Sequence, residues 1–155
     1  MIRHYNKGWA DGYHLNIKYW EVWNEPDCVP NMWEKSMNDY YEMYAVVAKR
    51  LKSEFPEIRI GGLVTTHLNQ EYIMSFLGKC ITENAPVDFI SWHKYGAVVQ
   101  DFVAEPFRAR ALLDAFGFRQ TELHLNEWHY LPCSWSAIRS TSESRRYWLT
   151  ASEGM

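Results

Sequence analysis

Short apolar runs alternate along this chain with longer stretches of helical spacing. The runs are rich in β-branched and aromatic residues and fall at residues 17–23, 58–64, 87–92 and 121–125. Their length and composition are typical of β-strands. Because they are nearly continuously apolar, we expect both faces of each strand to be covered, as in a parallel sheet.

The stretches between the runs carry apolar residues three and four positions apart, which predicts amphipathic helices. Helices are predicted over residues 38–55, 71–83 and 105–116, and a fourth from about residue 141. Pro106 is placed in the first turn of the third helix, where its missing N–H is tolerated, and Gly117 is placed at its end. The sequence therefore alternates strand and helix.

This alternation predicts an α/β fold built from βα units around a parallel sheet. The carboxyl ends of parallel strands all open on one rim, and that rim holds the site in barrels and in open α/β sheets. Hydrogen-bonding or ionisable residues follow every predicted strand. They are Asn24 and Glu25, then Thr65, Thr66 and His67, then His93, Lys94 and Tyr95, and finally Asn126, Glu127, Trp128 and His129.

Two of these groups contain an Asn-Glu pair, Asn24-Glu25 and Asn126-Glu127. Two carboxyl groups supplied by different strand ends are what hydrolysis of a glycosidic bond requires. One must hold a proton for the leaving oxygen, while the other must be ionised to attack the sugar or to activate water. The structural alternative is a helix-capping role for Glu25 and a salt bridge at the rim for Glu127.

Composition adds little against this interpretation. Aromatic residues make up 16% of the chain, which suits stacking on sugar rings but also suits a large core. A net charge of −3 gives no footprint for nucleic acid or for an anionic membrane. Three widely spaced cysteines favour neither a disulfide framework nor a zinc site, and no cofactor motif is present.

Three stretches resemble a known family. Residues 19–27, Tyr-Trp-Glu-Val-Trp-Asn-Glu-Pro-Asp, resemble the fourth-strand acid/base motif of clan A glycoside hydrolases and are most like family 39, which contains β-xylosidases and α-L-iduronidases. Residues 88–95 resemble the sixth strand of that family, and residues 123–128 resemble its seventh strand, which bears the nucleophile.

The resemblance implies a retaining glycosidase with Glu25 as acid/base and Glu127 as nucleophile. It implies that Asn24 contacts the sugar 2-hydroxyl, and that His93 and Tyr95 bind the sugar or orient Glu127. Trp128 is a candidate to stack on the sugar. A carbohydrate such as a xyloside is the expected substrate, with no cofactor, no nucleic acid and no membrane partner.

The resemblance also implies that residues 1–155 are a fragment of one catalytic (β/α)8 TIM barrel, truncated at both ends and holding approximately strands four to seven. A whole barrel needs about 250 residues. The sequence leaves open the sugar and linkage, exo or endo action, the oligomeric state and whether the chain folds or is active alone. No signal peptide is seen, so a cytoplasmic and a secreted location both remain open.

Two alternative functions remain. His93, His124 and His129 raise the possibility of a metal-dependent barrel hydrolase. His124 stands three residues before Glu127, however, so strand alternation predicts that the two side chains face opposite ways, and we expect no metal site. The second alternative is a non-catalytic carbohydrate-binding protein, against which the presence of both glutamates counts.

Trp23, next to Asn24, is predicted to lie in the core.

Overall fold

The structure, a computed structural model, describes residues 1–131. Its four strands form one curved parallel sheet in the order β1-β2-β3-β4. Their bounds are Tyr19–Glu21 (β1), Arg59–Thr65 (β2), Phe89–Gly96 (β3) and Glu122–Tyr130 (β4). The strands lie side by side in sequence order with a helix after each of the first three, which is the arrangement of a partial TIM barrel. The predicted fold class is confirmed.

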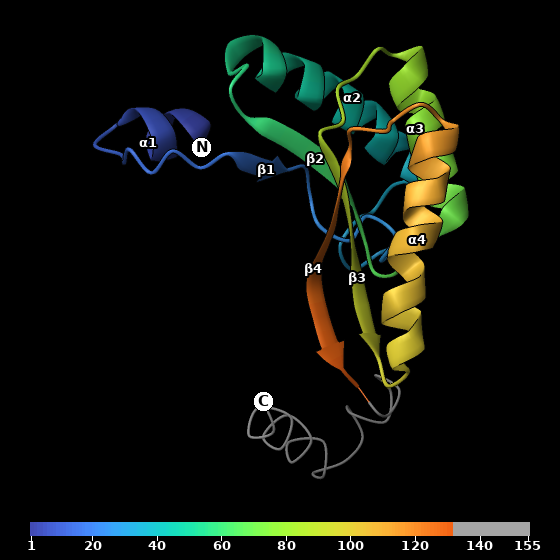
Figure 1. Cartoon of the computed structure of the whole chain (residues 1–155). Helices are drawn as coiled ribbons and strands as arrows, with labels where there is room; N and C mark the ends of the chain where they lie inside the picture. Colours follow the sequence, from blue (N-terminus) through green and yellow to red (C-terminus); the bar gives the residue numbers. More distant parts are fainter. Residues whose placement is uncertain (132–155) are drawn as a thin grey trace.

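Three helices cover one face of the sheet (Figure 1). They are α2 (Met37–Glu54), α3 (Gln70–Thr82) and α4 (Val99–Ala115); a short helix α1 (Ile2–Lys7) precedes β1. The main core lies between these helices and the sheet, and its fully buried members include Tyr40, Tyr44, Phe76, Ile60 and Ile90. None of the helices within residues 1–131 is long and apolar enough to cross a membrane.

Local sequence accounts for where α2 and α3 begin. Ser36 and Asp39 form a reciprocal capping box at the start of α2, and Asn69 accepts the backbone N–H of Tyr72 at the start of α3. Both devices satisfy backbone donors that the first helical turn leaves free. Pro56 follows α2 after one residue of cap, as expected for a residue that cannot continue a helix.

The strand bounds differ from the prediction. β1 covers only three residues of the predicted run 17–23, because Trp23 already has a left-handed backbone with φ 73°. In contrast, β3 and β4 extend through the polar residues that were expected to follow them. An apolar run therefore predicts too short a strand when the last residues of that strand are the polar residues of the site.

The start of α4 was predicted wrongly. The helix begins at Val99, so Pro106 lies in its interior rather than in its first turn. Contacts beyond the helix favour this longer segment, because Asp101 Oδ2 lies 3.7 Å from Lys94 Nζ of β3 and the Phe102 ring lies against Trp128 of β4. Tertiary contacts thus override the local preference. The fourth predicted helix, from about residue 141, lies outside the described residues.

The other face of the sheet is the inner face of the barrel arc, and it carries a layer of aromatic rings. Phe89 stacks on His124 with ring centroids 4.5 Å apart, and Tyr19 meets both rings. Gly61 makes room for this layer, since a Cβ there would lie 2.5 Å from the Phe89 ring. Barrel interiors are packed in such layers, and the polar groups described next lie above this one.

Candidate active site

Glu25 is held by the backbone of the neighbouring strand rather than by β1 itself. It lies four residues beyond the end of β1, and its backbone N–H donates to the carbonyl oxygen of Val64 in β2 at 2.8 Å. Its φ of 47° is unusual for a residue with a side chain. The position of this carboxyl group therefore depends on the conformation of β2 at Val64.

β2 has an irregular end at this point. Leu63 pairs with Ser91 and Thr65 pairs with Trp92, so Val64 is an extra residue in the ladder. Leu63 and Val64 both have positive φ, 77° and 47°, although each is buried. Such backbone strain in a β-branched residue persists only where the surrounding structure enforces it, and it is concentrated at functional sites.

The hydroxyl group of Tyr40 enforces this conformation. It donates to the carbonyl oxygen of Val22 at 3.1 Å and accepts the backbone N–H of Leu63 at 2.9 Å. Tyr40 is fully buried in α2, and burial raises the pKa of its phenol, so the hydroxyl stays neutral. It joins the two backbone segments that hold Glu25. Gly62 admits it, since a Cβ there would lie 2.6 Å from the oxygen.

An extra residue in β4 orients Glu127. Trp92 pairs with Leu125 but His93 pairs with Glu127, which leaves Asn126 without a partner in the ladder. Paired residues of parallel strands point to the same side of the sheet. The bulge at Asn126 therefore places Glu127 on the face of His93. In an unbroken register Glu127 would pair with Lys94 and face the helices.

The bulge also corrects the prediction for His124. His124 pairs with Ser91, so it shares the inner face with Glu127 instead of facing away from it. Simple alternation fails here because it counts Asn126 as a regular position. His124 lies below the rim, where its Nε2 atom is 3.0 Å from Glu122 Oε2 and its ring stacks on Phe89. This contact, with the nearby Arg59, lowers the pKa of Glu122.

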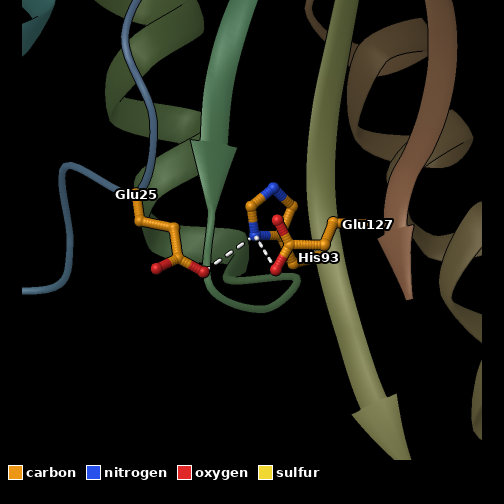
Figure 2. Close-up of side chains that lie close together, drawn as sticks. All are labelled: Glu25, His93 and Glu127. Carbon is orange, nitrogen blue, oxygen red and sulfur yellow. Dashed lines mark hydrogen bonds and ion pairs between the residues drawn. The ribbon is translucent and has the colours of Figure 1, made fainter. Parts of the chain in front are cut away.

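Three predicted residues meet at the rim (Figure 2). His93 Nδ1 lies 2.8 Å from Glu25 Oε1 and 3.6 Å from Glu127 Oε1. One oxygen of each carboxyl group and the imidazole nitrogen all fall within 4.8 Å of one another. His93 is buried, while the side chains of Glu25 and Glu127 are 21% and 48% exposed, so the two carboxyl groups cover the ring and remain accessible.

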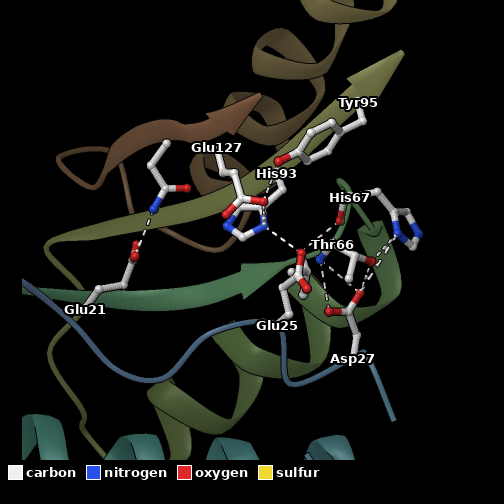
Figure 3. Close-up of polar contacts among 10 residues, drawn as sticks. Glu21, Glu25, Asp27, Thr66, His67, His93, Tyr95 and Glu127 are labelled. Atoms are coloured by element: carbon white, nitrogen blue, oxygen red, sulfur yellow. Dashed lines mark hydrogen bonds and ion pairs between the residues drawn. The ribbon is translucent and has the colours of Figure 1, made fainter. Parts of the chain in front are cut away.

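Tyr95 completes the group on the Glu127 side. Its hydroxyl donates to Glu127 Oε1 at 2.6 Å, which fixes one carboxylate oxygen (Figure 3). Partial burial and the neighbouring carboxylates, Glu127 above all, raise the pKa of Tyr95 to about 12. The phenol therefore remains a hydrogen-bond donor throughout the neutral and mildly alkaline range.

The remaining predicted residues lie elsewhere. Asn24 is exposed beside Glu25, and its side chain has no hydrogen-bond partner within residues 1–131. Trp128 pairs with Lys94 and lies against Phe102 of α4 with ring centroids 6.3 Å apart, so the structure does not bring it to Glu127. Trp23 is not a core residue as predicted, since it is 50% exposed and donates to the Met32 carbonyl oxygen.

A cleft of about 570 Å³ opens over Glu25, Tyr95 and Glu127. Its lining residues are Glu25, Cys28, Thr66, His67, Lys94, Tyr95 and Glu127. Glu25, His93 and Glu127 are also the one group within residues 1–131 whose donor atoms are close enough to hold a metal ion. The cleft thus offers two accessible carboxyl groups to a polar ligand, with the buried His93 ring in contact with Glu25.

Sequence reasoning missed three residues that support this arrangement. Tyr40 has the spacing of an ordinary core residue, and nothing in a helical stripe shows that its hydroxyl reaches two strands. Asp27 was noticed only as part of a motif, and Glu21, which accepts the Asn126 amide at 2.8 Å across the inner face, only as a strand residue. A polar atom at an otherwise apolar position was the available signal for Tyr40.

Comparison with known proteins gives the family. The sequence model of the glycosyl hydrolases family 39 matches residues 1–132. The chain belongs to glycosyl hydrolase family 39. Among its relatives, a β-xylosidase of Geobacillus stearothermophilus is 31% identical over 73% of this chain and 26% of that protein. The family 39 chain thus spans about a quarter of that relative's length.

Solved structures agree with this assignment. A glucosidase from Croceicoccus marinus superposes with a TM-score of 0.76 at 31% identity, covering 85% of this chain and 29% of that one. A family 39 β-xylosidase from Caulobacter crescentus gives a TM-score of 0.64 at 28% identity, covering 86% and 29%. An α-L-arabinofuranosidase from Thermotoga maritima, at 17% identity and a TM-score of 0.67, shares the fold alone.

Proposed function

We propose that this chain carries the catalytic pair of a retaining glycoside hydrolase that acts on β-linked pentosides such as xylosides. One observation supports this most strongly. Oxygens of Glu25 and Glu127 lie within 4.8 Å of each other at the mouth of one cleft. Retaining glycosidases place their two carboxyl groups about 5–5.5 Å apart, whereas inverting enzymes leave about 6.5–9.5 Å for a water molecule. The family's β-xylosidases suggest the substrate class.

In the first step, Glu127 attacks the anomeric carbon and the bond to the leaving oxygen breaks. The electron pair of that bond goes to the leaving oxygen, which takes a proton from Glu25. Because Glu25 Oε1 contacts His93, the second oxygen of Glu25 is the one available to the glycosidic oxygen. The product of this step is a glycosyl ester on Glu127.

In the second step, Glu25 removes a proton from water and the water oxygen attacks the anomeric carbon. The ester bond breaks and its electron pair returns to Glu127 as a carboxylate, so the configuration of the sugar is retained. Tyr95 donates to Glu127 Oε1 and leaves the other oxygen to attack. We place Asn24 near the sugar 2-hydroxyl and His93 and Tyr95 as groups that orient the two glutamates.

The remaining strands of the catalytic barrel are expected outside this chain, so the test uses the full-length protein. Glu127→Gly should abolish hydrolysis of an aryl β-xyloside, and azide should restore turnover with an inverted glycosyl azide as product. Glu25→Ala with azide should give the azide of retained configuration instead. Glu71→Gln, an exposed carboxylate of α3, is the matched control. Undiminished hydrolysis by Glu127→Gly contradicts the proposal.

A metal-dependent hydrolase is the second candidate, because Glu25, His93 and Glu127 could together hold an ion. The 2.8 Å contact of His93 with Glu25 is a hydrogen bond, whereas two ligands of one zinc ion lie about 3.4 Å apart when each is ~2.1 Å from the metal. Metal analysis and chelation separate the candidates: loss of activity on chelation, restored by one metal, would favour the second.

A further inference from the structure

Thr66 and His67, which follow β2, line the cleft together with Cys28. Figure 3 shows Thr66 and His67 next to Glu25, on the side away from Glu127. Under the proposed function Glu127 attacks the anomeric carbon while Glu25 protonates the leaving oxygen, so the leaving group departs on the side of Glu25. Thr66 and His67 are therefore placed where the leaving group would lie.

A buried carboxylate holds this wall in place. The side chain of Asp27 is only 3% exposed, and its oxygens accept the backbone N–H of Thr66 at 3.0 and 3.2 Å. Asp27 Oδ2 also lies 2.7 Å from Thr66 Oγ1. Three contacts thus join the loop of the acid/base residue to the loop after β2.

The hydrogen atoms of this chain of contacts can be assigned. Thr66 Oγ1 has one hydrogen, and an ionised Asp27 can only accept, so the hydroxyl donates to Asp27. The same Oγ1 lies 2.9 Å from His67 Nδ1 and must accept there, so Nδ1 carries a hydrogen. In the neutral imidazole the Nε2 atom of His67 is then a bare acceptor.

The His67 acceptor is available to a ligand. Its side chain is 60% exposed, and Nε2 has no partner in the part of the chain that the structure describes (Figure 3). Sugar hydroxyl groups are hydrogen-bond donors, and they are the groups that distinguish a sugar leaving group from an aryl one.

We propose that His67 Nε2 accepts a hydrogen bond from a hydroxyl group of the leaving sugar, and that Asp27, through Thr66, sets the imidazole tautomer that makes this possible. The inference rests on the proposed function. It assigns His67 to a leaving-group subsite that favours a saccharide over a hydroxyl-free leaving group. No bond is made or broken at this subsite, so it adds recognition without changing the chemistry.

The test compares kcat/KM for a β-linked xylo-disaccharide with kcat/KM for an aryl β-xyloside in the full-length protein. The quotient, the first value divided by the second, measures the preference for the leaving group alone, because both substrates carry the same xylose in the other half of the cleft. His67→Leu should lower it about 3- to 10-fold, the value of one ordinary hydrogen bond. His67→Gln, which keeps a carbonyl acceptor, should restore much of the loss.

Asp27→Asn supplies an independent arm. Its amide would donate to Thr66 Oγ1, the hydroxyl would turn to donate to His67 Nδ1, and Nε2 would then carry the hydrogen. The quotient should fall as in His67→Leu, and the imidazole ¹⁵N shifts of labelled histidine should report the exchanged tautomer.

An unchanged quotient in His67→Leu overturns the inference, and so does an equal loss in His67→Gln, which would indicate packing rather than an acceptor. Failure of the proposed function is distinguishable, because it shows in the wild-type protein, as absent hydrolysis or as release of the sugar with inverted configuration, whereas failure of the inference shows only in the variants.

Discussion

The two carboxyl groups are held in different ways, although they meet at one cleft. Glu25 lies on a loop, and its position depends on buried contacts, namely the Val64 carbonyl and the bridging hydroxyl of Tyr40. Glu127 lies on a strand, and its position depends on a bulge and on exposed contacts, the Tyr95 hydroxyl and the hydrogen bond between Asn126 and Glu21.

Within the described residues, the difference shows what a loop and a strand each need in order to position a catalytic side chain. Loop residues gain precision only from contacts beyond the loop, and the buried tyrosine supplies these for Glu25. A strand already fixes direction, so one inserted residue is enough to turn Glu127 toward His93. Perturbations of the Glu25 side should therefore affect stability and rate together, whereas those around Glu127 should affect mainly rate.

Substitution of the two glutamates themselves is expected to give the largest difference between the Glu25 side and the Glu127 side. Glu25→Gln should lower kcat/KM about 10²–10⁴-fold for a poor leaving group, because proton donation is lost. The loss should shrink for leaving groups that need no proton. Glu127→Gln should lose activity on both kinds of substrate. A Brønsted series of aryl xylosides measures this, and parallel losses in both variants would contradict the assigned roles.

The next effect concerns the bridging tyrosine. Tyr40→Phe leaves the buried N–H of Leu63 without a partner, so the free energy of unfolding should fall by about 1–3 kcal/mol. The kcat of the folded enzyme should fall about tenfold, corresponding to about 1.4 kcal/mol of lost positioning.

Tyr44 provides the matched control one turn later in α2. It is equally buried, but its hydroxyl donates to the Pro86 carbonyl oxygen, away from Glu25. Tyr44→Phe should lower stability while kcat stays unchanged. Equal changes in kcat for Tyr40→Phe and Tyr44→Phe would remove the special role of Tyr40. Urea unfolding and active-site-titrated rates supply both numbers.

A smaller effect is expected at Tyr95. Tyr95→Phe should lower kcat/KM about fivefold, or about 1 kcal/mol, because one donor to Glu127 is lost.

The pKa of Tyr95 is raised from 10.0 to about 12, so its neutral form is favoured by folding. This contribution to stability is complete below pH 10 and is lost as pH rises toward 12.

The gap in unfolding free energy between wild type and Tyr95→Phe should therefore narrow across that window. A gap that widens with pH would show that the phenol is not held in its neutral form.

The smallest effect is expected at Asn126. Asn126→Ala removes an exposed hydrogen bond to Glu21 but leaves the inserted residue in place. We expect kcat to fall only about twofold, less than the value of an ordinary hydrogen bond, since water replaces the lost partner. Steady-state kinetics on an aryl xyloside measures this. A loss above about tenfold would mean that the hydrogen bond, rather than the bulge, orients Glu127.

The sequence predicted the parallel βα order and the gathering of polar groups at one rim, because apolar runs and strand polarity are local properties. That topology brings Glu25, His93, Tyr95 and Glu127 to the same rim, but the bulge at Asn126 turns Glu127 toward His93. The family resemblance supplied their roles, which remain proposals.

What could not be predicted depends on single inserted residues and on distant partners. Alternation misplaced His124 because nothing local marks Asn126 as a bulge. The hydroxyl of Tyr40 and the tautomer of His67 depend on atoms from other elements. The interior position of Pro106 likewise follows from contacts of Asp101 with β3 and of Phe102 with β4.

The stereochemistry of hydrolysis tests the central claim most directly, because it depends on the separation of the two carboxyl groups. An aryl β-xyloside can be hydrolysed by the full-length protein in D₂O, and the first sugar released can be followed by proton NMR. A pair whose oxygens lie within 4.8 Å predicts that β-xylose appears first and then mutarotates. If α-xylose appears first, the enzyme inverts configuration, and Glu127 is not a nucleophile.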